Sequence, residues 1–332
     1  MTSQPAQTPY PESQFPRPRI VVSRCLGFDH CRYDGSTIPN PIVKALGEFV
    51  DYITPCPEVE IGLGAPRPPV RIVQTPQGPR LLQPATGRDV TDAMQAFAQT
   101  FLDSLPPVDG FILKNRSPSC GIKDAKIYAS ADKGPAVGTR PGFFGGAVLE
   151  RFPDLPVEDE GRLTNRAIRE HFFTVIFALA DLRQVVQEGR MAALVDFHSR
   201  HKFLLMVYHQ ARLRELGRIV ANPEKRPTSD LIQEYAQGFR AALARPPRRP
   251  AVYNALTHAL GYVSERLSPS ERAFFLQTLQ PYREGRVPLS APLAVLRSWI
   301  VRFGVDYLAQ QSFFFPFPEA LIIPLDSGCG EV

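Results

Sequence analysis

The chain has 332 residues, of which 44% are hydrophobic and 21% charged, a length and composition typical of a globular protein with two domains. No apolar run is long enough to cross a bilayer, and residues 1–16 lack the apolar core of a signal peptide. We therefore expect a cytoplasmic protein with a disordered tail over residues 1–16 and no membrane association. Its five cysteines are then free thiols or metal ligands rather than disulfides.

Residues 17–160 alternate between strand and helix patterns. β-Branched or apolar runs predict strands, and apolar side chains three to four residues apart predict helices. In chain order we expect a strand at 19–23, a helix from 40 to 50, a strand at 52–54, a hairpin of 70–73 and 80–82, a helix through 105 capped by Asp89 or Thr91, and a strand at 109–113. This order predicts an α/β fold with a Rossmann-like, mostly parallel sheet.

Three cysteines each follow one of these predicted strands by a few residues. They are Cys25, Cys56 and Cys120. Ligand sites of parallel sheets lie beyond the carboxyl ends of the strands, so the three side chains should converge on one edge of the sheet. Buried structural thiols are the alternative interpretation.

The number and spacing of these cysteines narrow the kinds of metal site. Structural zinc usually takes four ligands with closely spaced cysteine pairs, and electron-transfer clusters take four thiolates, so three cysteines without a CxxC pair disfavour both. The CxxxCxxC run of radical enzymes is also missing, which disfavours radical chemistry. Three thiolates on a [4Fe-4S] cluster leave one iron open as a Lewis acid.

The second half of the chain differs in pattern and charge. Residues 153–160, with two prolines and three consecutive acidic side chains, predict a connector. Helical patterns then cover residues 165–180, 182–193, 194–216, 228–244, 251–267, 269–284 and 290–307, and the Phe-rich run 313–317 should pack back on them. We see no strand pattern and no internal repeat, so residues 161–332 predict an all-α bundle.

The basic side chains gather in this helical half. Residues 1–160 carry 16 basic and 18 acidic side chains, whereas residues 161–332 carry 22 and 15, and 20 of the 22 are arginines. This asymmetry favours an anionic partner for the second half, although a mild excess of arginine is also typical of a solvated surface.

Five motifs over residues 17–163 resemble the thiouracil desulfidase (TudS) domain. They are Ser-Arg-Cys-Leu-Gly at 23–27 with Arg-Tyr-Asp-Gly at 32–35, Pro-Cys-Pro-Glu-Val at 55–59, Pro-Arg-Pro-Pro at 66–69, Lys-Asn-Arg-Ser-Pro-Ser-Cys-Gly at 114–121, and Gly-Phe-Phe at 142–144 followed by Phe-Pro-Asp-Leu-Pro at 152–156. The helical half, with Phe-His-Ser-Arg-His-Lys at 197–202, resembles the domain fused to it in the tRNA 4-thiouridine desulfidases (RudS). We therefore expect a catalytic iron–sulfur domain over 17–160 and an Arg-rich, tRNA-binding helical domain over 161–332.

The resemblance implies a [4Fe-4S] cluster held by Cys25, Cys56 and Cys120, with the fourth iron open to the sulfur of a thiocarbonyl. Water would replace that sulfur and convert 4-thiouridine in tRNA to uridine, with release of sulfide and no redox change. The residues are compatible with this chemistry, because an open iron suits a soft sulfur and a nearby carboxylate can deprotonate the water.

Glu58, two residues after Cys56, is the predicted base for that water. The alternative for Glu58 is a loop carboxylate paired with Arg67 or Arg24. Cys31 would be a spare thiol near the cluster, and Cys329, in the C-terminal tail, would have no role.

Two further residues have predicted catalytic roles and three have predicted substrate contacts. Ser117 would hydrogen-bond the ring or pass a proton, or else cap a turn, and Asp34 would contact substrate or form a turn. Lys114 and Asn115 leave the third predicted strand towards the same edge and, with Arg67, would position the nucleotide.

The predicted RNA contacts lie on the helical half and are Arg200, Lys202, Arg212 and Arg248. His198, His201 and His209 fall near one helical face, where no carboxylate completes a metal site, so we assign them to the same basic surface. Arg214, Arg245 and Arg249 are further candidates for phosphate contacts, since arginine binds phosphate bidentately. A solvated helix face is the alternative for each residue.

Two other functions are compatible with these residues. One keeps the chemistry but takes free thiouracil or a thiolated nucleotide, with the helical half serving stability, dimerisation or closure of a lid. The other is a non-enzymatic iron–sulfur sensor that binds nucleic acid, which would not need the carboxylate of Glu58. No obligate protein partner is expected.

Overall fold

The computed structural model describes residues 15–132 and 134–322, which form two compact units. The described part of the α/β unit comprises Arg17–Ile176 and residues 320–322, and that of the helical unit comprises residues 15–16 and Phe177–Glu319. This division falls inside a long helix, so a functional boundary after residue 160 stays a prediction. Residues 1–14 of the predicted tail and Cys329 lie outside the described residues.

The α/β unit is built on a four-stranded sheet in which every pair of neighbours is parallel. Its strands, in the order β2-β1-β6-β9, are β2 (Asp51–Ile53), β1 (Arg19–Val22), β6 (Gly110–Leu113) and β9 (Val157–Asp159). All four residues of β6 are buried, as expected of a parallel strand covered on both faces. The predicted parallel sheet is confirmed, with one addition. The acidic segment predicted as a connector contains β9, because its backbone pairs with β6 although it has no apolar run to signal a strand.

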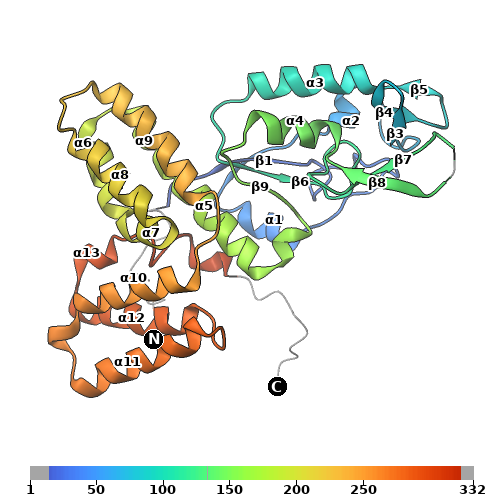
Figure 1. Ribbon diagram of the computed structural model, residues 1–332. Helices are drawn as coiled ribbons and strands as arrows, with labels where there is room; N and C mark the ends of the chain where they lie inside the picture. Colours follow the sequence, from blue (N-terminus) through green and yellow to red (C-terminus); the bar gives the residue numbers. More distant parts are fainter. Residues whose placement is uncertain (1–14, 133, 323–332) are drawn as a thin grey trace, which may run out of the picture. The chain divides into compact units, whose positions relative to one another are not determined.

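Helices cover both faces of this sheet (Figure 1). They are α3 (Thr91–Ser104) and α4 (Phe143–Arg151) on one face, and α1 (Pro41–Leu46) on the other. The Asn40 side chain accepts hydrogen bonds from the first turn of α1, which starts that helix at Pro41 as predicted. α1 ends before the predicted residue 50, and α4 was not predicted.

A second, five-stranded sheet carries the predicted hairpin. Its strands, in the order β5-β4-β3-β7-β8, are β5 (Arg88–Asp89), β4 (Gly78–Gln83), β3 (Arg71–Thr75), β7 (Ala125–Tyr128) and β8 (Ala136–Arg140). β3 and β4 pair antiparallel with Thr75 opposite Gly78, which confirms the hairpin. The sequence pattern predicted neither β7 nor β8. Most of β8 is exposed and has few apolar side chains, so it lacks the signal of a buried strand.

The helical unit contains no strand within its described residues, as predicted. Its helices are the end of α5 (Arg166–Glu188), α6 (Met191–Arg200), α7 (Lys202–Tyr208), α8 (Gln210–Ala221), α9 (Thr228–Leu243), α10 (Arg249–Gly261), α11 (Pro269–Arg283), α12 (Ser290–Phe303) and α13 (Asp306–Ala309). The single helix predicted at 194–216 is wrong, since the chain breaks at His201 and His209 into α6, α7 and α8.

The Phe-rich run packs on the bundle as predicted. Phe314 is fully buried, and its ring centroid lies 5.6 Å from that of Phe203. Among the described helices, none combines the length and the apolar character needed to cross a membrane.

Candidate active site

A cavity of about 360 Å³ is lined by the loops that follow β1, β2 and β6. β1 pairs in parallel with both β2 and β6, so these three loops leave the sheet at the same edge. The structure brings Cys25, Cys56 and Cys120 together on the cavity wall and adds Cys31 to them. The cavity therefore presents four thiols, one more than the predicted ligand set.

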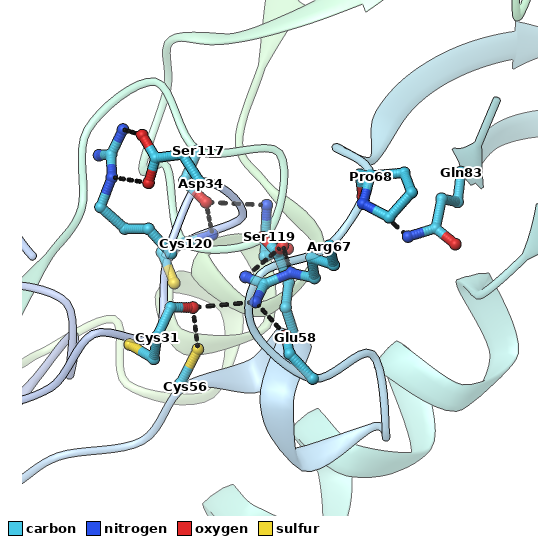
Figure 2. Close-up of polar contacts among 12 residues, drawn as sticks. Cys31, Asp34, Cys56, Glu58, Arg67, Pro68, Gln83, Ser117, Ser119 and Cys120 are labelled. Atoms are coloured by element: carbon cyan, nitrogen blue, oxygen red, sulfur yellow. Dashed lines mark hydrogen bonds and ion pairs between the residues drawn. The ribbon is translucent and has the colours of Figure 1, made fainter. Parts of the chain in front are cut away.

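The thiols lie close to one another and are mostly buried. Cys56 Sγ lies 3.7 Å from the carbonyl oxygen of Cys31, and Figure 2 shows the thiols of Cys31, Cys56 and Cys120 gathered in one place. Burial raises the pKa of Cys120 to about 12, and a hydrogen bond with the Cys25 thiol raises the pKa of Cys31 to about 11. Buried thiols of this kind become thiolates only beside positive charge, which a metal centre supplies.

These residues fit the iron–sulfur group that the sequence predicts. Thiolates are the usual protein ligands of iron–sulfur clusters, and these thiols come from three separate loops around one space. Across residues 15–132 and 134–322, no three His, Cys, Asp or Glu side chains gather closely enough to hold a single metal ion.

The loop that carries Cys120 is organised by two serines. The Ser117 hydroxyl accepts hydrogen bonds from the backbone N–H of Ser119 at 3.2 Å and of Cys120 at 3.0 Å, which is the turn-capping role given as its alternative. Ser117 also lines the cavity, as its predicted catalytic role requires. Ser23, at the end of β1, accepts a hydrogen bond from Lys114 N at 2.9 Å and so fastens the start of this loop to the neighbouring strand.

The first turn of α4 packs directly on this loop. Gly145 N donates to Ser119 O at 3.0 Å, and a Cβ at Gly145 would lie 2.3 Å from the oxygen of Gly121 and 2.5 Å from that of Cys120. The close approach of two backbones explains why glycine occupies this position.

Gly145→Ala is therefore expected to displace the Cys120 loop and to lower the free energy of unfolding by at least about 1–3 kcal/mol. Gly146→Ala is the matched control, because among the described residues its Cβ would meet only the Cβ of Pro141, at 3.5 Å. A helical alanine there should leave stability unchanged or raise it by up to about 1 kcal/mol. Urea titration of both variants measures the difference, and equal midpoints would contradict the packing argument.

Glu58 lies in α2 (Pro57–Glu60), directly after Cys56, and lines the cavity. Its Oε2 accepts from Arg67 Nε at 2.9 Å and its Oε1 from the Ser119 hydroxyl at 2.8 Å (Figure 2). An ion pair with Arg67 or Arg24 was the alternative to a catalytic role for Glu58. The structure shows the pair with Arg67, whereas Arg24 pairs with Glu60. Arg67 and Ser119 thus fix a carboxylate at the cavity wall. Its Oε2 faces both Nε and Nη2 of Arg67, and its Oε1 keeps a further lone pair for water.

Arg67, a predicted substrate contact, is buried and largely occupied by the protein. Besides Glu58, its guanidinium donates to the carbonyl oxygens of Cys31 at 2.9 Å and Gly64 at 2.5 Å. Arg67 therefore ties the Cys31 loop to Glu58, and within the described chain a single Nη2 N–H is left for a substrate.

Lys114 and Asn115, the other predicted substrate contacts, line the cavity and are held by Glu160. Lys114 Nζ forms an ion pair with Glu160 Oε1 and donates to Asn115 O at 3.0 Å, and Asn115 N donates to Glu160 Oε2 at 2.9 Å. Glu160 follows β9 and was not singled out by the sequence. This network fixes the start of the Cys120 loop.

Asp34, a predicted catalytic residue, does not line the cavity. It is exposed, pairs with Arg32 at 3.2 Å, and accepts hydrogen bonds from Ser36. These contacts, with Arg32 first, hold the pKa of Asp34 well below its usual range. The geometry is that of the turn given as its alternative role.

The predicted RNA contacts differ in how far the protein compensates their charge. Arg200 pairs with Asp181 at 2.6 Å and with Asp196 at 2.7 Å, and Arg212 pairs with Glu215 at 2.9 Å. Lys202 and Arg248 are exposed, and neither forms an ion pair with a described residue.

The three histidines do not share one helical face. His201 is buried at the junction of α6 and α7, with Nε2 2.8 Å from Asp181 Oδ2 and Nδ1 2.7 Å from the Ser312 hydroxyl. Its assignment to the RNA-binding surface is wrong, because the break in the helix turns its ring into the core. His209 caps α8, and His198 lies 3.0 Å from the Tyr235 hydroxyl.

Comparisons with known proteins match both parts of the chain. Residues 20–160 match the family model of 2-thiouracil desulfurase. A protein of known structure, the [4Fe-4S]-dependent thiouracil desulfidase TudS, is 30% identical in sequence, and the match covers 46% of this chain and 98% of that chain, with a TM-score of 0.38. The chain belongs to the 2-thiouracil desulfurase family. This membership supports a desulfurase activity for the α/β unit.

Two further relatives are named as uncharacterized proteins. YbbK of Bacillus subtilis (strain 168) is 33% identical over 109 residues, which are 31% of this chain and 72% of the relative. YbgA of Escherichia coli (strain K12) is 29% identical over 148 residues, which are 44% of this chain and 88% of the relative. Residues 202–318 match a second model, described as a protein of unknown function (DUF1722).

Proposed function

We propose that this desulfurase is a [4Fe-4S]-dependent enzyme that converts 4-thiouridine in tRNA to uridine and releases sulfide. The observation that carries the proposal is the cavity in which Cys25, Cys56 and Cys120, from three loops, lie beside Glu58. Support comes from the family membership and from the [4Fe-4S] dependence of the related TudS.

The three thiolates would hold the cluster, and the cluster would supply a soft Lewis acid for the thiocarbonyl sulfur. The remaining chemistry falls to the protein. Glu58 would hold a water molecule at the cavity wall and take its proton, while Ser119 and Arg67 keep the carboxylate in place. The thiolated base would leave its stack to enter the cavity, as other base-modifying enzymes require.

The helical unit would bind the tRNA through exposed cations such as Lys202 and Arg248. Each phosphate contact makes binding more dependent on salt, because counterions leave the RNA when the protein binds. Substrate recognition through the RNA backbone suits a folded tRNA, which is read by shape and phosphate position.

Arg248→Gln is therefore expected to weaken tRNA binding and to reduce the slope of log Kd against log salt by about one. Arg286→Gln is the matched control, because Glu284 already pairs with Arg286 at 2.6 Å. Filter binding at several salt concentrations gives both slopes. Equal slopes for Arg248→Gln and the wild type would argue against a phosphate contact at this position.

The decisive experiment is an anaerobic turnover assay. The full chain is reconstituted with iron and sulfide and given bulk tRNA that contains 4-thiouridine, and the thiocarbonyl absorbance and the nucleoside composition are followed. Loss of 4-thiouridine with an equal gain of uridine supports the proposal. Turnover of thiolated nucleotides or thiouracil alone would assign a small-molecule substrate, and no turnover by an intact cluster would favour a sensor.

A further inference from the structure

A groove of about 730 Å³ in the α/β unit lies apart from the active-site cavity, and no residue lines both. Its walls come from α3, α4, β4 and β8, and Figure 1 shows the two helices side by side. Ala98 and Leu102 of α3 and Ala147 of α4 contribute apolar surface, while Gln95 of α3 contributes an amide. This volume and this mixture of apolar and polar groups are typical of a site for a small molecule.

Arg140, the last residue of β8, lines the groove and has no ion-pair partner within the described chain. Its Nη1 atom is buried, and no acceptor in residues 15–132 or 134–322 lies within hydrogen-bond distance of it. The guanidinium carbon lies 5.1 Å from the ring centroid of Phe143, so the ring covers one face of the group. A buried N–H without an acceptor is unfavourable, and a ligand that supplies an acceptor would remove this cost.

The other two arginines of the groove are compensated by carboxylates. Arg80 pairs with Asp89 at 2.7 Å, and Arg151 pairs with Asp103 at 3.7 Å. Among the described residues that line the groove, the uncompensated positive charge is therefore that of Arg140. This charge selects an anionic ligand.

The carboxylates of the groove limit which anion it suits. Asp103 and Glu150 both line it, and Glu150 forms no ion pair with a described residue. These negative charges disfavour a dianion such as phosphate. A single carboxylate instead matches the planar guanidinium of Arg140 with two parallel N–H···O bonds, and the apolar helix surfaces suit the hydrocarbon part of the same molecule.

We propose that this groove binds a small organic carboxylate, with its charged group on Arg140 and its apolar part between α3 and α4. A small rotation of the Arg140 side chain would turn Nη1 towards the groove, where it donates to the ligand. This binding site is separate from the active-site cavity, and the inference does not rest on the desulfidase function.

Ligand-observed NMR with benzoate and benzamide tests the site, because the two probes have nearly the same shape and differ in charge. The full chain should bind benzoate at least about tenfold more tightly than benzamide, as charge-assisted pairing with arginine gives. Arg140→Gln should lose this preference, and Arg140→Lys should keep part of it. Because the guanidinium has no ion-pair partner within the described chain, Arg140→Gln should unfold at the wild-type urea concentration.

Two further variants locate the site. Arg88→Gln removes an exposed arginine of β5 that lines neither the groove nor the active-site cavity, and it should keep the full preference. Ala147→Leu fills the space between the helices with Arg140 intact, so it should weaken the binding of both probes. Equal affinities of the wild type for the two probes, no measurable binding of benzoate, an unchanged preference in Arg140→Gln, or unchanged binding by Ala147→Leu would overturn the proposal.

Discussion

Cys120→Ala is expected to remove the iron and the desulfidase activity together, whereas Cys31→Ala is expected to retain both. Both thiols line the same cavity, are buried, and have a raised pKa. Neither burial nor pKa therefore indicates which of the two is a cluster ligand. The predicted ligand set includes Cys120 and leaves out Cys31, because three thiolates leave one iron open to substrate and a fourth would occupy it.

The measurement is iron and sulfide content after identical anaerobic reconstitution, with the absorbance of the cluster and the turnover of 4-thiouridine recorded on the same samples. We expect Cys120→Ala to lose at least about 100-fold in turnover, as loss of a metal ligand or its support typically does. If Cys31→Ala loses iron to the same extent as Cys120→Ala, the cluster has four cysteine ligands and the open-iron mechanism fails.

The second large effect concerns Glu58, the carboxylate proposed to activate water. Glu58→Gln is expected to lower kcat by about 10²–10⁴-fold, the usual contribution of a general base, while the cluster content stays unchanged. Glu60→Gln is the matched control, since Glu60 lies in the same helix, pairs with Arg24 and does not line the cavity. It should turn over 4-thiouridine at the wild-type rate.

Loss of Glu58 also leaves the buried guanidinium of Arg67 without its carboxylate, which destabilises a protein by about 3–5 kcal/mol. Chemical rescue separates the two effects. Formate should restore part of the rate to Glu58→Ala, because a small carboxylate can occupy the vacated position and accept the proton. A variant that keeps its cluster and fold and turns over normally would exclude Glu58 as the base.

Ser119 also holds the Glu58 carboxylate. Ser119 was not predicted by the sequence, and its hydroxyl touches Glu58 from 61 residues away along the chain. Only the folded loop after β6 brings the two together. The pair shows that the sequence pointed to a carboxylate that lines the cavity but not to the group that orients it.

Local patterns determined the parts of the fold whose signals lie within a few residues. The β-branched run of β1, the buried run of β6 and the spacing of α3 each depend on neighbouring side chains, so β1, β2, β6, α1 and α3 followed from periodicity, whereas β9 and α4 did not. The position of three cysteines directly after three strands then predicted their convergence on one sheet edge, and the cavity contains all three.

Tertiary structure decided everything that depends on contacts between distant segments. β9 exists because an acidic segment pairs with β6, and the Lys114–Glu160 ion pair joins residues 46 positions apart. His201 left the predicted RNA-binding surface because the helix breaks there and its ring meets Asp181. The sequence could not decide either whether Glu58 pairs with Arg67 or with Arg24. Whether a cation has a partner depends on which carboxylates approach it in three dimensions, and periodicity carries no information about that approach.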